Sequence, residues 1–171
     1  MKGLDKMPNK PKGKRILIMG LNDSGKTTFS QLLQKKLKCP YFNADQVRAQ
    51  FFDYDFTIRG RNRQARRMKI LCDWALKLGH EYAIADFICP TPRTRNLFLA
   101  DHCVFLDTVN RTPFLDTQRI FTTPTLYIDA DFRVILRRNF EEAVENFIWT
   151  KLKVEDSRVP ISQRGIRKEK E

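Results

Sequence analysis

The stretch GLNDSGKT at residues 20–27 decides the fold of this 171-residue chain. It matches the pattern G-x-x-x-x-G-K-[ST] in full, with Gly20, Gly25, Lys26 and Thr27 at the defining positions. Glycines permit backbone conformations that a Cβ atom would block, so successive N–H groups can turn inward around a phosphate. The lysine can bridge two phosphates and the threonine hydroxyl can bind Mg²⁺. The motif therefore predicts a phosphate loop for ATP and Mg²⁺.

The segments on either side of the loop fit this prediction. RILIM at residues 15–19 is a short apolar run of the kind found in buried parallel strands, and residues 28–37 place their apolar side chains on one helical stripe. A helix that begins at the bound anion also adds its dipole. We expect the phosphates to be held by the loop and the first helical turn, namely by Gly20, Asn22, Asp23, Ser24, Gly25, Lys26, Thr27 and Thr28.

Apolar segments and helical patterns alternate along the rest of the chain, which is typical of a parallel sheet with helices on both faces. Further strands are predicted at residues 41–42, 82–88, 103–106 and 126–128. Further helices are predicted at residues 45–49, 61–78, 93–99 and 139–149, and a loop at 108–123. Asp45 is a candidate cap for the first of these helices, and Asn139 with Glu142 for the last. We predict a three-layer α/β P-loop fold with about five parallel strands, over residues 15–150.

The net charge of +12 is concentrated in the two ends of the sequence, with +5 in residues 1–15 and +3 in residues 151–171. Residues 1–14 are predicted to be a disordered basic leader and residues 151–171 a charged tail. A small anionic substrate is the favoured partner, while salt-sensitive binding of nucleic acid by the tails and a homodimer stay open. The four cysteines lack metal-ligand spacing, and we find neither a signal peptide nor an apolar run that could span a membrane. These features predict reduced thiols and a cytoplasmic protein.

The phosphate loop alone does not define the reaction, because GTPases, ATPases and small kinases share it. The sequence lacks the N-K-x-D stretch with which GTPases recognise their base, and 171 residues are few for a motor ATPase. Both observations favour a kinase that transfers the terminal phosphoryl group of ATP to a small acceptor.

Two acids follow predicted strands at the edge where parallel sheets bind ligands. Asp45 could hold a Mg²⁺-bound water or accept the proton of the acceptor hydroxyl, and Asp86 is a candidate Mg²⁺ ligand because buried acids require a partner. Lys26, Asp45 and Asp86 are the predicted catalytic residues, and Thr27, Asp45 and Asp86 the predicted metal ligands. A mere capping role for Asp45 and a structural role for Asp86 remain open.

A second group of side chains is predicted to face an anionic acceptor. Arg48 lies one helical turn after Asp45, and Arg61 and Gln64 share one helix face through their i,i+3 spacing. Guanidinium groups pair with phosphate or sulfate through two parallel hydrogen bonds. Phe56 completes the group. The alternative is an ordinary solvated helix face.

The order of these motifs resembles the adenylylsulfate kinase family, in particular short phage-type adenylylsulfate kinase-like proteins, over residues 15–95. The family motifs G-L-S-G-S-G-K-T, D-G-D-N-V-R, D-R-x-x-N-I-x-R and F-I-S-P correspond here to GLNDSGKT, NADQVR, GRNRQARR and DFICP. The resemblance implies a role in sulfate assimilation, with Asp45 assisting the 3′-hydroxyl of adenylyl sulfate. It further implies that the adenine and phosphosulfate contact Arg48, Phe56, Arg61, Gln64 and Ile88.

The sequence departs from the family pattern on the acceptor side. Asn43 stands in place of the first acid of D-G-D, Gln64 in place of asparagine and Cys89 in place of serine. The family's K-G-L-Y-K-x-A lid has no counterpart, and residues 108–123 take its place, with Arg111 and Arg119 as the predicted lid cations. Two alternatives therefore stay open. One is a P-loop kinase for a nucleoside, nucleotide, sugar or polynucleotide end, and the other is a nucleotide-dependent nucleic-acid-binding module.

Overall fold

Strand β1 (Lys14–Met19) lies in the middle of a five-stranded sheet, in a computed structural model that describes residues 13–153. The strand order is β2-β3-β1-β4-β5, and every pairing is parallel. The other strands are β2 (Tyr41–Asn43), β3 (Tyr82–Asp86), β4 (His102–Leu106) and β5 (Phe132–Val134). Because parallel neighbours need a crossover connection, the chain returns over one face or the other between strands. The predicted parallel sheet is confirmed.

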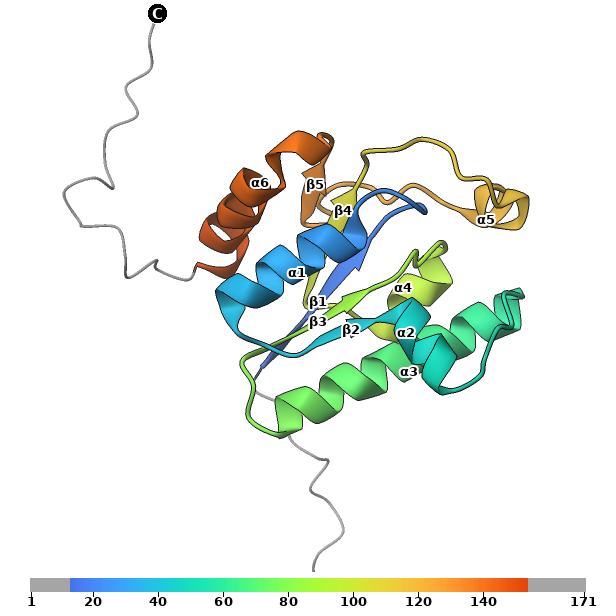
Figure 1. Cartoon of the computed structure of the whole chain (residues 1–171), viewed down its shortest axis with the longest axis horizontal. Helices are drawn as coiled ribbons and strands as arrows, with labels where there is room; N and C mark the ends of the chain where they lie inside the picture. The colour runs from blue at the N-terminus through green and yellow to red at the C-terminus, as the bar shows by residue number, and fades with distance from the viewer. Residues whose placement is uncertain (1–12, 154–171) are drawn as a thin grey trace, which may run out of the picture.

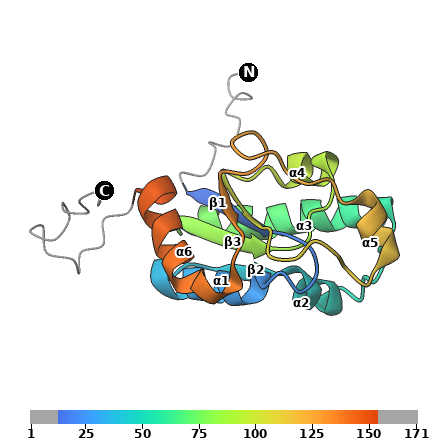
Figure 2. The same ribbon diagram turned by 90° about the horizontal axis from the view of Figure 1, so that it is seen from above.

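Helices cover both faces of the sheet, so the molecule has three layers (Figures 1 and 2). One face is covered by α1 (Lys26–Leu37) and α6 (Phe140–Phe147), and the other by α3 (Ile58–Lys77) and α4 (Pro92–Phe98). Shorter elements complete the chain: α2 (Ala44–Gln50), α5 (Leu115–Ile120), a 3₁₀ turn at Arg137–Asn139 and a π-helical turn at Ile148–Leu152. Within residues 13–153, no helix is long and apolar enough to cross a lipid bilayer.

The alternating side chains of β1 form the centre of two hydrophobic cores. Ile16 and Ile18 pack beneath α1 and α6, while Leu17 and Met19 pack beneath α3 and α4. All four are almost fully buried, because a central parallel strand is covered on both faces. The apolar run at residues 15–19 is therefore the central strand of the sheet, and it delivers the phosphate loop to the carboxyl edge.

The fifth strand lies later in the chain than predicted. Leu126 makes only an isolated bridge with Ala130, and residues 127–129 form a turn between them. The Asp129 and Ala130 N–H groups donate to the Thr125 carbonyl, and the Asp129 carboxylate accepts from the Thr125 N–H. Tyr127 and Ile128 are exposed there. The strand is instead β5 at residues 132–134, which pairs with β4. The backbone of this apolar segment makes its hydrogen bonds within the turn that Asp129 closes, and not to a neighbouring strand. The apolar character of residues 126–128 alone therefore gave the wrong position for the fifth strand.

Two local predictions also require correction. Asn43, rather than Asp45, caps α2: its Oδ1 accepts from the N–H groups of Asp45 at 3.1 Å and Gln46 at 3.0 Å. Asn139 does precede α6, but its side chain makes no capping hydrogen bond. The segment 108–123, predicted as a loop, contains helix α5, whose Thr117 is buried. Tertiary contacts of that threonine, described below, hold the short helix in place.

The boundaries of the two end segments shift slightly. Lys14 belongs to β1, and Lys151 and Leu152 belong to the last helical turn. The predictions for residues 1–12 and 154–171 lie outside the described residues.

Candidate active site

The phosphate loop connects the carboxyl end of β1 to the first turn of α1, and its backbone requires glycine at two positions. Gly20 has φ +151° and Gly25 has φ +90°. A Cβ atom on Gly20 would lie 2.5 Å from the Leu106 carbonyl oxygen, and one on Gly25 would lie 2.5 Å from the Phe140 ring. Neither distance is sterically possible for a real side chain. The two glycines of the motif are therefore required by the packing of the loop against β4 and α6.

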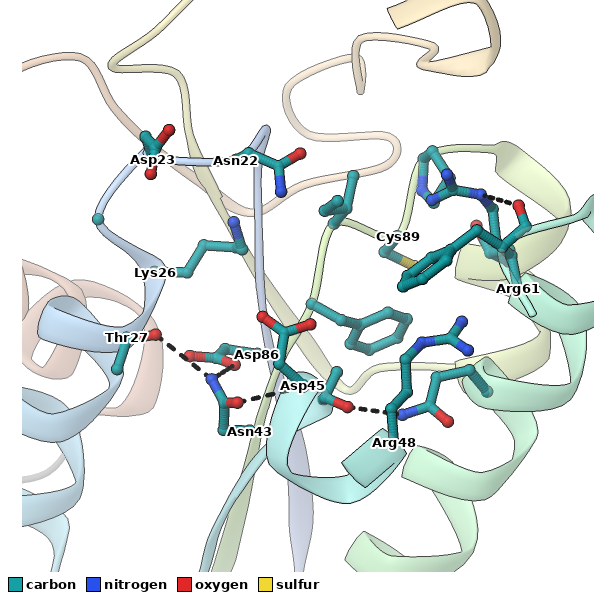
Figure 3. Close-up of a pocket in the computed structure, with 18 of the residues that line it drawn as sticks. Asn22, Asp23, Lys26, Thr27, Asn43, Asp45, Arg48, Arg61, Asp86 and Cys89 are labelled. Atoms are coloured by element: carbon teal, nitrogen blue, oxygen red, sulfur yellow. Dashed lines mark hydrogen bonds between the residues drawn. The ribbon is translucent and has the colours of Figure 1, made fainter. Parts of the chain in front are cut away.

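Lys26 lies in a desolvated position above this loop. Its amine donates to the Leu21 carbonyl at 2.7 Å and faces the same space as the Asp45 carboxylate (Figure 3). Burial lowers the pKa of Lys26, an effect that Asp86, Asp45 and Asp23 partly oppose and Arg137 reinforces. An incoming polyphosphate would favour the charged amine for the same electrostatic reason. The lysine is thus placed to bind an anion over the loop.

Asp86 lies at the end of β3 and is almost completely buried. Its Oδ2 accepts from the Tyr41 hydroxyl at 2.6 Å, and its Oδ1 accepts from Asn43 Nδ2 at 2.8 Å. The same amide nitrogen lies 3.3 Å from Thr27 Oγ1 (Figure 3). Burial raises the pKa of Asp86, whereas the hydrogen bond from Tyr41 and the charge of Lys26 oppose that shift. Asp86 therefore has the structural hydrogen-bonding role that the sequence left open. Through Asn43, these hydrogen bonds also hold its carboxylate near the Thr27 hydroxyl.

The Thr27 hydroxyl and the Asp86 carboxylate fit a magnesium ion. Mg²⁺ commonly keeps several waters and takes one or two protein oxygens together with substrate phosphates. Thr27 and Asp86 supply such oxygens at the mouth of the phosphate loop, and Asp45 lines the same cavity. Asp45 is exposed in the first turn of α2, and its carboxylate makes no hydrogen bond or ion pair within residues 13–153.

Arg48 forms the floor of the acceptor side. Its side chain is only 6% exposed, its guanidinium lies 4.6 Å from the centre of the Phe56 ring, and its Nη1 donates to the carbonyls of Asp53 at 3.0 Å and Asp55 at 3.1 Å. Burial lowers the pKa of Arg48, while Asp53 opposes the shift. The bonds to two carbonyls of the segment between α2 and α3 fix the direction of the guanidinium.

Arg61 connects the acceptor side to helix α5. Its Nε donates to the Phe56 carbonyl at 2.8 Å, while its Nη2 donates to Asp116 Oδ2 at 2.6 Å and to Thr117 Oγ1 at 2.9 Å. The predicted helix-face pairing of Arg61 with Gln64 places both at the cavity, but Gln64 bonds to the protein itself. Its Nε2 donates to the Ala44 carbonyl at 3.1 Å, and its Oε1 accepts from Arg67. Gln64 therefore joins α3 to α2.

A cavity of about 420 Å³ joins these two groups of residues. From the phosphate loop it is lined by Asn22, Asp23, Gly25, Lys26 and Thr27, and from the acceptor side by Asp45, Arg48, Phe56, Arg61, Gln64, Asp86 and Ile88. Gly20 and Thr28 do not line it, nor does Ser24, which is buried within the loop. Cys89 lines the wall as a buried thiol whose pKa is raised by burial to about 12, which fits the predicted reduced cysteine.

The predicted lid cations do not reach the cavity, but another arginine does. Arg111 and Arg119 are exposed and are not among the lining residues, whereas Arg137 is. Thr108 Oγ1 donates to the Ser24 carbonyl at 2.7 Å and Thr112 Oγ1 to Asn22 Oδ1 at 3.1 Å, so the segment after β4 lies directly against the phosphate loop. Sequence reasoning missed Arg137. The Arg-Arg pair just before the predicted last helix was the available signal.

Of the comparisons with known proteins, the comparison with solved structures agrees with this architecture. No protein-family model and no curated protein sequence matches the chain. Among solved structures, the APS kinase CysC of Mycobacterium tuberculosis in complex with AMPPNP and APS is similar, with 22% identity, a TM-score of 0.60, and coverage of 81% of this chain and 96% of that one.

Two kinases for other substrates are about as similar in fold. A sugar kinase from Janibacter sp. HTCC2649 has 16% identity and a TM-score of 0.61, with coverage of 80% of this chain and 93% of that one. Shikimate kinase from Aquifex aeolicus has 20% identity and a TM-score of 0.54, with coverage of 79% and 94%. At such low identity these similarities establish the architecture alone: the chain has the fold of P-loop kinases.

Proposed function

We propose that this chain is an ATP-dependent small-molecule kinase that phosphorylates the 3′-hydroxyl of adenylyl sulfate. One observation carries the proposal: Lys26 of the phosphate loop and the Arg48–Phe56–Arg61 group line opposite ends of the same cavity, with Asp45 also in its lining. A polyphosphate donor at one end and an anionic acceptor at the other would thus both lie next to Asp45. The sequence motifs that resemble adenylylsulfate kinases lie on these residues.

On the donor side, the loop backbone at residues 20–27 would hold the β-phosphate of ATP, and Lys26 would neutralise charge on the transferring group. Thr27 and Asp86 would hold Mg²⁺, with Asp45 as a further oxygen ligand through water. When bound, Mg²⁺ would supply positive charge to the phosphate oxygens. Arg137, which lines the cavity beside Lys26, would add a second protein cation.

On the acceptor side, Asp45 would accept the proton of the attacking hydroxyl, because its carboxylate is unengaged and in the lining. Arg48 and Arg61 would pair with the phosphosulfate, Phe56 would contact the adenine, and Gln64 and Ile88 would shape the wall. The segment 108–123 would close over the reactants and exclude water, with Arg111 and Arg119 turning inward. We propose a cytoplasmic setting for this reaction.

A coupled assay of ADP release tests the acceptor. Adenylyl sulfate should raise the rate well above the acceptor-free rate, whereas adenosine 5′-phosphate, which lacks the sulfate, should raise it much less. An equal rate with and without adenylyl sulfate would reject this acceptor. The Lys26→Ala variant serves as the blank for contaminating kinases.

One observation favours a second candidate, a kinase for a different acceptor. Arg61 already bonds to Asp116 and Thr117, so it has less capacity for an anion than the resemblance implies. Labelled ATP and a panel of nucleosides, sugars and oligonucleotides with 5′-hydroxyl ends would identify such an acceptor by the labelled product. Nucleic-acid binding through the basic ends involves residues outside the described part of the chain. A separate measurement of oligonucleotide binding would show it as salt-sensitive binding without labelled product.

A further inference from the structure

Asn43 uses both atoms of its amide to join three elements of the site. Its Oδ1 caps α2 through the N–H groups of Asp45 and Gln46. Its Nδ2 donates to Asp86 Oδ1 at 2.8 Å and lies 3.3 Å from Thr27 Oγ1. A single side chain therefore contacts the strand that carries Asp86, the helix that carries Asp45, and the first turn after the phosphate loop (Figure 3).

The carboxylate of Asp86 depends on β2 for its orientation. A buried acid is costly unless its oxygens accept hydrogen bonds. Here Tyr41 donates to one oxygen and Asn43 to the other, and these two residues share one face of β2 because they are two positions apart. Both donors are held by the parallel pairing of β2 with β3, which aligns Asn43 with Asp86.

An aspartate could not make the same contacts. The Asn43 nitrogen lies at hydrogen-bond distance from an Asp86 oxygen, so a carboxylate there would place two acidic oxygens against each other. It would retain the cap of α2, because aspartate and asparagine cap helices about equally well. The amide is thus required for the bridge and interchangeable for the cap, and this difference allows the two roles to be separated.

We propose that Asn43 is a positioning residue that sets Thr27 and Asp86 relative to each other and couples them to the helix of Asp45. The proposal rests on the proposed function, because it assumes that Thr27 and Asp86 serve the bound nucleotide and its metal. It concerns an amide at the position where the resembled family has an acid. In this chain, the groups that would hold the metal are organised by a neutral donor rather than by a further charge.

The Asn43→Ser variant should lose the bridge, meaning the contacts of the Asn43 amide nitrogen with Thr27 and Asp86, and keep the cap of α2. Serine caps as well as asparagine, but it is shorter and has no amide donor to span Thr27 and Asp86. Because Asp86 Oδ1 loses a donor, we expect a modestly lower melting temperature for the ligand-free variant, while α2 stays capped. Calorimetry should show unchanged ADP affinity in EDTA, but the gain in affinity on adding Mg²⁺ should shrink by about tenfold, as for other groups that orient metal ligands. The kcat should fall by a similar factor while the acceptor KM stays within about twofold.

Asn43→Asp tests the same bridge through charge. Without Mg²⁺, the new carboxylate should repel Asp86 and lower the melting temperature. Addition of Mg²⁺ should restore it by a larger increment than in the wild type, since a cation relieves the repulsion. This measurement needs neither ATP nor an acceptor.

Thr57→Ser is the matched control, because Thr57 caps the neighbouring helix α3 and lies outside the cavity lining. It should resemble the wild type in every measurement. Wild-type Mg²⁺ enhancement in Asn43→Ser, or an Asn43→Asp variant that is equally stable in EDTA and Mg²⁺, would show that Asn43 is only a cap and overturn the proposal. A wild-type protein that binds ADP with Mg²⁺ but transfers to no acceptor would instead overturn the proposed function and leave the bridge intact.

Discussion

The donor half of the cavity is formed by one continuous segment of backbone, whereas the acceptor half is formed by side chains from several elements. The donor half is eight consecutive residues whose backbone conformation is imposed by two glycines and by contacts to β4 and α6. The acceptor half is made of side chains from α2, the segment after it, α3 and the end of β3. Its two arginines, Arg48 and Arg61, already bond to protein groups.

The difference indicates how specificity could change in this fold. Any substitution in the donor half alters a backbone cradle that all nucleoside triphosphates share. A substitution on the acceptor side changes one contact among several and leaves the cradle in place. Kinases for an adenylyl sulfate, a sugar and shikimate share this architecture, and such a division would permit that variety. The predictions below test whether the two halves are in fact separable.

The largest effect should come from Lys26→Ala in the donor half. Among residues 13–153, Lys26 is the one lysine in the cavity lining. Its removal takes away a positive charge at the place where negative charge builds up during transfer, so turnover should fall by about 10⁴-fold. The ligand-free melting temperature should hold or rise, because the amine is desolvated and its pKa is lowered by burial. Steady-state rates and a thermal melt measure both quantities.

Lys36→Ala provides the control for this variant. Lys36 lies on the same helix, is exposed, and pairs with Glu145 far from the cavity. It should retain the wild-type rate. Near-normal turnover of Lys26→Ala would refute the role of the phosphate loop and, with it, the contrast between the two halves.

Asp45→Asn should have the next largest effect. The amide cannot accept the proton of the acceptor hydroxyl, so kcat should fall by about 10²-fold or more. The affinity for ADP with Mg²⁺ should change little, because the loop and Thr27 are intact. Calorimetry measures the affinity for ADP with Mg²⁺, and single-turnover experiments measure the rate of phosphoryl transfer. A parallel loss of ADP affinity and transfer would mean that Asp45 supports the structure of the donor half.

The donor half could be predicted from sequence, and most of the acceptor half could not. Residues 20–27 are contiguous, and their chemistry is local, so the motif fixed the loop, its strand and its helix. Asp45 was located at the cavity because a parallel sheet brings its carboxyl ends together, and Arg48 lies one helical turn after it. Phe56 and Arg61 were placed there through the resemblance to adenylylsulfate kinases. Their hydrogen-bond partners were not predictable, because they lie up to 56 residues away along the chain.

The misses have a common physical cause. Arg137 reaches the cavity from a turn after β5, and β5 itself was placed in the wrong apolar triplet. Short elements contribute few periodic residues, so tertiary contacts outweigh their local pattern. The same holds for α5, where the contact of Thr117 with Arg61 stabilises a helix that composition did not indicate.

Arg48→Lys should produce a smaller and more selective loss. Lysine keeps the charge but not the planar fork that bonds to two carbonyls and lies over Phe56. The acceptor KM should rise by about tenfold, equivalent to about 1.4 kcal/mol, while the KM for ATP stays unchanged. Arg66→Lys, an exposed change on α3 outside the cavity lining, should alter neither. A rise in the KM for ATP would show that the halves are not independent.

Asp116→Asn should have the smallest effect, and in the opposite direction. Asp116 is 60% exposed and bonds to the buried Arg61 at 2.6 Å, so it competes with any anion for that guanidinium. The hydrogen bond from Arg61 lowers the pKa of Asp116, which means that the competing form is the charged carboxylate at neutral pH. The amide keeps the shape and removes the charge.

We therefore expect Asp116→Asn to lower the acceptor KM by about threefold at low salt, with less change at high salt, because exposed ion pairs contribute only about 0–1 kcal/mol and are screened. Glu145→Gln neutralises an equally exposed, paired acid remote from the cavity and should leave the KM unchanged. A raised KM in Asp116→Asn alone would mean that Asp116 orients Arg61 for the acceptor instead of competing with it. Helix α5 would then be part of the acceptor half, which would be completed by the segment after β4.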